Sequence, residues 1–265
     1  MTVSKVDSAG GERSVPTGAG DFPVRFEQSD TVDPTFAGRR EIKYVLNRGN
    51  LDLARDLMES RFERVVFHRE VSVVRSIYFD DHQLATCYAN LDGLGRRYKA
   101  RLRWYDQPLA ERQVYFEVKW RRSLVTGKFR SPLVLERPLA EINYRDLRRG
   151  IQAVLPDSSQ LFARIYDQPV VLVEYQREHF MCRELGLRMT LDYDLVFYDQ
   201  SGKLRPTVRC GVAMPQLALI EAKSVPPAPR ELSRLLRPLA QRVARCSKYV
   251  HGCAQVGRIP MSMTW

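Results

Sequence analysis

The chain has 265 residues, of which 44% are hydrophobic, and a formal net charge of +11. This length suits one large domain or two small ones, and the apolar content is ample for a core. No apolar run of about 18 residues is present, which excludes a membrane-spanning helix. The positive charge favours polyanionic ligands: polyphosphate, nucleotides, nucleic acid or acidic lipid.

The N-terminal segment differs in composition from the rest of the chain. Residues 1–37 are net acidic, rich in Gly, Ser and Pro, and lack the apolar core of a signal peptide. We expect a disordered tail at 1–37, a single folded domain at 38–257 and a short C-terminal tail at 258–265. The five cysteines form no CxxC pair, so we expect reduced, packed thiols in a cytoplasmic protein rather than a metal site.

Periodicity and turn residues predict the elements in chain order. A strand at 39–46 is followed by a helix at 51–62 with Asn50 as its N-cap, a strand at 71–79 and a short helix at 82–91. Strands at 96–105, 112–122 and 128–136 come next, and then a helical stretch at 138–166 with breaks at Gly150 and Pro156. Strands at 169–181, 186–198 and 217–223 and a broken helix at 230–255 complete a chain of seven or eight strands.

One of these strands carries four positive charges on a single face. Its basic residues are Arg97, Lys99, Arg101 and Arg103, and they alternate with Tyr98, Ala100, Leu102 and Trp104. Because side chains alternate between the two faces of a strand, one face is cationic and the other is apolar. Like charges packed in this way repel one another unless a polyanion lies between them, so the strand indicates a phosphate-rich ligand.

Five further strands gather charged residues on one face. These faces hold Glu41 with Lys43; Glu117 with Lys119 and Arg121; Tyr175 with Arg177 and His179; Arg188 with Thr190, Asp192 and Asp194; and Glu221 with Lys223. The pattern is typical of a closed antiparallel sheet around a polar lumen, with helices covering its apolar outside. Asp192 and Asp194 would either add to a metal site or pair with arginines of the lumen.

The common enzyme motifs are absent, since there is no Walker A loop, GxGxxG, HExxH or nucleophile elbow. Catalysis would therefore depend on positioning and charge, as it does in phosphoryl transfer. In such a site cations hold the phosphates in line. A carboxylate such as Glu221 would hold a divalent metal that bridges phosphate oxygens.

Nine short segments together resemble a known family. They are Arg40-Glu-Ile-Lys-Tyr44, Ser76-Ile-Tyr-Phe-Asp80, Tyr98-Lys-Ala-Arg-Leu-Arg103, Phe116-Glu-Val-Lys119, Thr126-Gly-Lys128, Pro169 through Tyr175-Gln-Arg177, Leu187-Arg-Met-Thr-Leu-Asp192, Ile220-Glu-Ala-Lys223 and Ser247-Lys-Tyr249. In this order and spacing they resemble the VTC domain. That domain is the polyphosphate polymerase module of the vacuolar transporter chaperone complex and its bacterial relatives, within the triphosphate tunnel metalloenzyme superfamily.

The resemblance implies an α+β fold: an antiparallel, eight-stranded β-barrel tunnel with a polar, basic lumen and flanking helices. Together with the charged strand faces it predicts the catalytic residues Lys43, Arg101, Arg103, Lys119, Arg177 and Arg188. The predicted substrate-binding residues are Lys99, Lys128, Tyr175, Lys223, Ser247 and Lys248. The predicted ligands of Mn²⁺ or Mg²⁺ are Glu221 and Glu41. Many tunnel enzymes begin with Glu-x-Glu-x-Lys, but the first glutamate is Arg39 here, so Glu41 could equally pair with a neighbouring lysine.

Three functions are compatible with this pattern. The first is a polyphosphate polymerase that moves the γ-phosphate of ATP onto a polyphosphate chain. The second is a hydrolase that cleaves triphosphate, nucleoside triphosphate or short polyphosphate, and the third is a non-catalytic module that binds polyphosphate or RNA. The expected partners are ATP or triphosphate and inorganic polyphosphate. A specific nucleic acid is not expected because the aromatic residues do not lie on the charged faces, and the resemblance leaves room for a membrane-protein partner.

Overall fold

The computed structural model describes residues 24–26, 40–67, 69–123, 125–224, 230–239 and 243–263. The strands are β1 (Val24–Phe26), β2 (Arg40–Asn47), β3 (Glu63–Arg64), β4 (Ser72–Asp80), β5 (Arg96–Tyr105), β6 (Gln113–Arg122), β7 (Val125–Leu135), β8 (Gln168–Cys182), β9 (Leu187–Asp199), β10 (Val212–Met214) and β11 (Leu217–Ser224). The α-helices are α1 (Leu51–Glu59), α2 (Ala85–Leu91), α3 (Tyr144–Val154), α4 (Asp157–Ile165), α5 (Arg230–Leu235) and α6 (Lys248–Gln255). Short 3-10 helices lie at Arg48–Asn50, Leu139–Glu141, Arg237–Leu239 and Met261–Met263.

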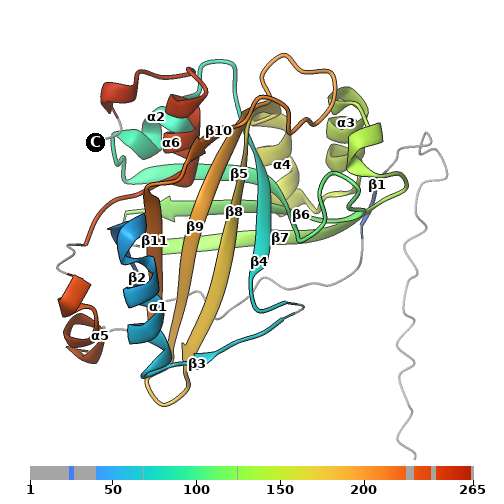
Figure 1. Cartoon of the computed structure of the whole chain (residues 1–265). Coiled ribbons are helices and arrows are strands. Elements are labelled where there is room, and N and C mark those ends of the chain that lie inside the picture. The colour runs from blue at the N-terminus through green and yellow to red at the C-terminus, as the bar shows by residue number, and fades with distance from the viewer. Residues whose placement is uncertain are drawn as a thin grey trace, which may run out of the picture.

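The strands form one antiparallel sheet. Its main order is β1-β7-β6-β5-β4-β8-β9-β11-β2, with β10 on β9 and β3 on β8. Figure 1 shows β5, β6 and β7 running across the direction of β8, β9 and β11, so the sheet bends around its inner face. An antiparallel sheet with flanking helices confirms the predicted α+β class.

The predicted closure of the sheet into an eight-stranded barrel is wrong. The sheet has eleven strands in the described part of the chain, and β2 at one end does not pair with β1 at the other. The free edge of β2 instead meets the segment that leads into α6. Val243 forms a bridge with Tyr44, and the Ala244 N–H donates to the Lys43 carbonyl at 2.9 Å. This segment protects the edge that a barrel would pair with another strand.

Several local predictions also differ from the structure. Val24–Phe26, inside the expected tail, pairs with Leu133–Leu135 of β7, while the rest of 1–37 lies outside the described residues. The 138–166 stretch breaks before α4 at Pro156 as predicted, but Gly150 lies within α3 without breaking it. Asn50 makes no side-chain cap; the side chain of Asn47 accepts from Gly49 N–H and caps the preceding 3-10 helix.

Helices cover the outer face of the sheet, as predicted, but two helices pack on its inner face. The core around Trp104 lies between the outer face of β5–β7 and the helices α3 and α4. The core around Phe197 lies between the inner face of β8, β9 and β11 and the helices α2 and α6, because Tyr175 and Leu219 of this core share strand faces with Arg177 and Glu221. A third core, around Leu191, packs α1 and α5 against β2, β9 and β11. None of the helices in the described ranges is long and apolar enough to span a bilayer. The charged strand faces therefore lie on the inside of the bend, next to the core that α2 and α6 cover.

Candidate functional site

The cationic face of β5 points into the bend of the sheet. Tyr98, Ala100, Leu102 and Trp104 pack into or against the outer core. The alternate residues turn inward, where Arg103 is only 6% exposed. The period-two prediction for this strand is therefore confirmed, and its basic side chains meet residues from β4, β6, β8 and α6.

A buried carboxylate on β6 gathers four of the inner cations. Glu117 is 2% exposed, and its Oε2 accepts from Arg101 Nη2 at 2.6 Å and lies 3.8 Å from Arg103 Nη1. Its Oε1 lies 3.4 Å from both Lys128 Nζ and Arg130 Nε of β7. We call these five residues the Glu117 cluster. Burial alone would raise the pKa of Glu117, but the four cations, Arg101 foremost, hold it well below its ordinary value.

The position of Lys128 depends on a glycine. Lys128 lies opposite Lys119 in the β6–β7 register, and Gly127 lies opposite Trp120. A Cβ at position 127 would lie 2.2 Å from the Trp120 ring, so a side chain there would displace the indole. The Thr126-Gly-Lys128 segment therefore uses glycine to bring β7 against that ring.

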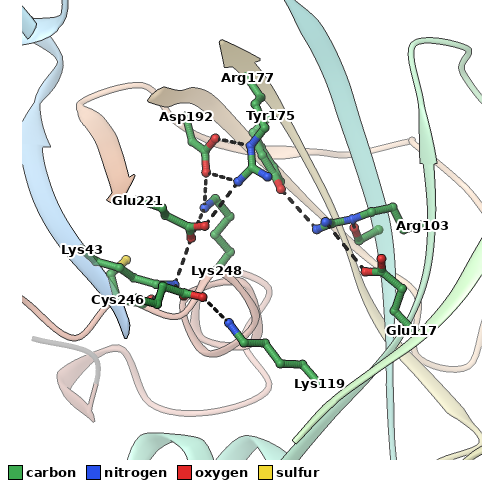
Figure 2. Close-up of polar contacts among 12 residues, drawn as sticks. Lys43, Arg103, Glu117, Lys119, Tyr175, Arg177, Asp192, Glu221, Cys246 and Lys248 are labelled. Atoms are coloured by element: carbon green, nitrogen blue, oxygen red, sulfur yellow. Dashed lines mark hydrogen bonds and ion pairs between the residues drawn. The ribbon is translucent and has the colours of Figure 1, made fainter. Parts of the chain in front are cut away.

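A second group of charges surrounds Glu221 on β11 (Figure 2). Glu221 Oε1 lies 2.9 Å from Lys43 Nζ and 3.3 Å from Lys248 Nζ, and its Oε2 lies 3.5 Å from Arg177 Nη2. Asp192 on β9 accepts from Arg177 through both carboxylate oxygens at 2.6 Å and from Lys248 at 2.6 Å. We call these five residues the Glu221 cluster.

Burial and ion pairing oppose each other in the Glu221 cluster. Burial would lower the pKa of Lys43 and Lys248, but Glu221, with Glu41 at Lys43 and Asp192 at Lys248, raises both. Burial would raise the pKa of Glu221 and Asp192, but Lys248 and Arg177, together with Lys43 at Glu221, lower both. All these groups are therefore charged at neutral pH.

Tyr175 joins the two clusters. Its hydroxyl accepts from Arg103 Nη2 at 3.2 Å, and its ring lies 4.8 Å from Lys248 Nζ and 5.2 Å from the Arg177 guanidinium carbon. Figure 2 shows Arg103 and Glu117 on one side of this ring and Asp192 and Glu221 on the other. The two clusters therefore form one charged interior, to which phosphates of a single ligand could bind.

Two further contacts cross the interior. Lys119 on β6 lies 2.6 Å from Glu41 on β2, although these strands are far apart in the sheet order. Lys99 on β5 donates to the Ser247 hydroxyl at the N-terminus of α6 at 2.8 Å. The Lys119–Glu41 pair spans the interior where a barrel would have hydrogen-bonded strands.

Burial lowers the pKa of several interior lysines, among them Lys99, Lys223 and Lys128. Burial, with Lys43 and Lys119 nearby, lowers the pKa of Lys99 well below its ordinary value. Burial likewise lowers the pKa of Lys223 to about 8, although Glu41 and Glu221 oppose it. A bound anion would favour the protonated form of these side chains.

Most predicted site residues therefore come together, but two residues predicted to face the interior, Arg188 and Asp194, do not lie in it. Arg188 is exposed, and no ion pair within the described ranges includes it; it lies opposite Lys223 in the sheet. Asp194 leaves the interior and pairs with Arg48 at 3.2 Å. Its φ is +52°, and a bulge interrupts the β8–β9 register beside it, so the alternation of faces does not continue past Tyr193.

Two interior residues were not predicted. Arg130 shares the face of Lys128 on β7, so the same alternation would have identified it. The ring of Tyr78 is buried in the core around Phe197, but its hydroxyl accepts from Arg101 Nη1 at 3.1 Å. No pattern in the sequence separates such a tyrosine from an ordinary core residue.

The predicted metal ligands do not form a ready-made cage. The described residues hold no group of three or more His, Cys, Asp or Glu side chains able to bind a metal. Glu41 pairs with Lys119 and Lys43, and Glu221 and Asp192 share the ammonium of Lys248. Divalent cations such as Mg²⁺ often bind through one or two carboxylates plus substrate phosphates. These carboxylates could therefore bind a divalent cation only together with phosphate oxygens of a ligand. Their lysine partners would first have to move away from them.

Comparison with known protein families matches residues 38–257 to the VTC domain. The chain belongs to the VTC domain family. A solved structure from Hippeastrum, described as an adenylyl cyclase with a dominant triphosphatase activity, aligns with 16% sequence identity and a TM-score of 0.41. The alignment covers 83% of this chain and 97% of that one. No curated protein matches the chain.

Proposed function

We propose that this VTC domain protein is a polyphosphate polymerase that transfers the γ-phosphate of ATP to a polyphosphate chain held in the charged interior, with a divalent metal assisting. The observation that carries the proposal is the excess of basic over acidic side chains in the two clusters that Tyr175 joins. Membership of the VTC domain family supports it, because the family resemblance implies polyphosphate synthesis.

The basic residues would act by neutralising and aligning phosphates. Phosphoryl transfer proceeds through a loose transition state whose charge is spread over the equatorial oxygens, so positioning and electrostatics supply most of the catalysis. Arg101 and Arg103 would hold phosphates from the β5 side, and Arg177 from β8 would hold them from the other side of Tyr175. Guanidinium groups suit this task because they bind phosphate oxygens in pairs.

The carboxylates would serve as partners that ligand phosphates replace. In the structure Glu117 and Glu221 each bind several cations, so the cations are already oriented around a negative centre. A phosphate group that enters would take over these contacts, as carboxylate and phosphate oxygens accept the same hydrogen bonds. This preorganisation reduces the reorganisation needed at the moment of transfer.

The protonation states of the interior carboxylates favour a phosphate group rather than water as the acceptor of the transferred phosphoryl group. The carboxylates Glu117, Asp192 and Glu221 have lowered pKa values, which makes them weak bases. A terminal phosphate of the chain is already ionised at neutral pH, with a second pKa of about 6, and needs no base to attack. Water would need one, so the interior suits polymerisation better than hydrolysis.

Glu221 and Asp192 are the residues that would hold a divalent metal together with phosphate oxygens of the ligand. When bound, such a metal would neutralise charge on the oxygens of the transferring group. The lysines at Glu221 would move from the carboxylate to the incoming phosphates, where they remain useful as point charges.

Hydrolysis is the second candidate, and Lys223 favours it. With a pKa of about 8, a fraction of Lys223 is neutral near neutral pH and could accept a proton from water. In that case the same interior would hold triphosphate or a nucleoside triphosphate, and Lys223 would act as general base.

The deciding experiment supplies purified protein with ATP and either Mn²⁺ or Mg²⁺, with and without a polyphosphate primer, and resolves the products on a gel. Chains that lengthen with time support the polymerase, and release of phosphate alone identifies a hydrolase. Binding of triphosphate without any product would leave a binding module. Arg55→Ala is a matched control for Arg101→Ala, because Arg55 also binds a buried glutamate but on the outer side of the sheet.

A further inference from the structure

A cluster of five arginines lies at the end of β5 and β6 that faces α2 (Figure 1). The cluster, named here the edge arginines, consists of Arg96, Arg97, Arg121, Arg122 and Arg245. Arg97 lies opposite Arg121, and Arg96 opposite Arg122, in the β5–β6 register. Arg245 comes from the segment before α6. Its guanidinium group lies against Gly93, since a Cβ on Gly93 would be only 2.6 Å from Arg245 Nη1.

No acidic partner binds an edge arginine within the described residues. Several other surface arginines are paired, as Arg148 is with Asp167 and Arg258 with Asp199. Within the described ranges, none of the ion pairs includes an edge arginine. The contacts made by the cluster go to neutral groups, such as the carbonyls of Gly93 and Leu94 for Arg97 and the carbonyl of Ser123 for Arg121. Positive charge therefore accumulates at this corner without compensation.

Arg97 and Arg121 continue the cationic face of the interior, whereas Arg96 and Arg122 lie on the opposite face of the two strands. Arg97 shares a face of β5 with Lys99, Arg101 and Arg103, and Arg121 shares a face of β6 with Lys119. Residues two apart on a strand are about 6.8 Å apart, so the row from Arg103 to Arg97 extends over about 20 Å. Exposure rises along it: Arg103 is buried, Arg97 is half-buried and Arg245 is exposed. The row thus leads from the interior to the molecular surface.

The arrangement is unfavourable without an anion. Burial and the neighbouring guanidinium groups of Arg121 and Arg245 lower the pKa of Arg97, which shows the repulsion within the cluster. A hollow of about 400 Å³ lined by Gly95, Arg96, Arg122 and Ser123 lies on the opposite face of these strand ends, away from Arg97 and Arg121. The guanidinium groups of Arg97, Arg121 and Arg245 are well suited to bind phosphate oxygens in pairs.

We propose that the edge arginines form a second phosphate-binding site, which holds a segment of polyphosphate outside the charged interior while another segment occupies the interior. This inference rests on the proposed function, because it assigns the ligand of the interior to the same chain. A narrow phosphate chain can reach the half-buried Arg97 and Arg121, whereas a flat membrane surface cannot. Bases of RNA would need an open aromatic face, but Trp120 has Arg122 over its ring and Gly127 packed against it.

The test compares ligands of different length on matched variants. The triple variant Arg97→Gln, Arg121→Gln, Arg245→Gln removes three edge charges, and the control Arg145→Gln, Arg149→Gln, Arg209→Gln removes three exposed charges elsewhere. Affinities for triphosphate and for long-chain polyphosphate are measured at several salt concentrations, and circular dichroism and Tm check folding. We expect the edge variant to lose at least tenfold in affinity for the long chain, with a shallower salt dependence, and less than twofold for triphosphate. The control should change either affinity by less than twofold.

Other outcomes separate the two proposals. Unchanged long-chain affinity in the folded edge variant would overturn the second site, even if triphosphate binds normally. If wild-type protein binds neither triphosphate nor long chains, the proposed function fails first. Loss of binding to phosphatidylserine vesicles or to single-stranded RNA, with long-chain polyphosphate binding intact, would assign the edge arginines to that ligand and overturn the proposal. If the triple variant does not fold, the single variant Arg245→Gln is used for the same comparison of triphosphate and long-chain affinities, because Arg245 lies outside the sheet.

Discussion

Replacing Glu117 by Gln removes the negative charge at the centre of the Glu117 cluster while keeping the shape of the side chain. Four basic side chains then surround a neutral amide at a position that is 2% exposed. Removing one partner of a buried ion pair costs about 3–5 kcal/mol. For a domain of this size about 1 kcal/mol corresponds to 2–4 °C, so we expect the Tm without ligand to fall by about 6–20 °C.

Triphosphate should reverse this loss, because its oxygens supply the negative charge that the variant lacks. The wild-type protein must displace Glu117 from its cations before phosphate binds, whereas the variant need not. We therefore expect Glu117→Gln to bind triphosphate at least tenfold more tightly, which corresponds to about 1.4 kcal/mol. Thermal melts over a triphosphate titration measure both effects, and the rise in Tm should be larger in the variant than in wild type.

Glu178→Gln is the matched control. Glu178 is 1% exposed and pairs with Arg55 at 2.9 Å and Arg64 at 2.8 Å, on the side of the sheet covered by α1. Its replacement should also lower the Tm, but triphosphate should raise the Tm no more than in wild type. Equal rescue of both variants, or no rescue of either, would refute the placement of the ligand at the Glu117 cluster.

Four further predictions concern the charged interior. Arg101→Ala and Arg103→Ala should each lower turnover by about tenfold to a hundredfold, since a charge-assisted contact is worth about 1.5–3 kcal/mol, and should also lower the unliganded Tm, because both pair with buried Glu117; full activity in both would contradict their role. Glu221→Gln should collapse metal-supported turnover while triphosphate affinity in chelator persists or improves, and an unaltered metal titration would instead point to Glu41, Glu117 or Asp192 acting without Glu221. Triphosphate binding at pH 8 should take up protons, because the lowered pKa values of Lys99 and Lys223 rise beside an anion. Calorimetry in two buffers of different ionisation enthalpy measures this uptake, which Lys223→Met should reduce. Since the folded pKa of Lys223, about 8, lies below the unfolded value of about 10.4, stability should also rise with pH between these values.

Alternation along the strands predicted most of the charged interior, and the family resemblance added Lys248. Lys43, Arg177 and Lys248 meet around Glu221, and Arg101 binds Glu117, although these residues lie far apart in the sequence. The method fails where the alternation itself is interrupted. At Asp194 a positive φ and a neighbouring bulge move the side chain outward, and nothing in the local composition marks that bulge.

Other features depend on long-range geometry that strand patterns do not encode. Whether a sheet closes depends on the pairing of its two end strands, and β2 pairs with residues 243–244 rather than with β1. The central place of Glu117 follows from the approach of β5 and β7 on both sides of β6. From the sequence Glu117 was only one acidic residue on a basic face. Strands of two or three residues, such as β3 and β10, are too short to show any period.

The segment leading into α6 has a consequence for how the protein is made. Lys43 Nζ donates to the carbonyl of Cys246, 203 residues further along the chain, and Glu221 binds both Lys43 and Lys248. During synthesis, Lys43 leaves the ribosome long before either partner exists. Contacts of such sequence separation form late, because a long loop must close first. A nascent chain therefore keeps Lys43 without Glu221 and the Cys246 carbonyl, and Arg177 without Glu221, until β11 and the segment before α6 have been translated, and cellular polyanions can bind these cations during that interval.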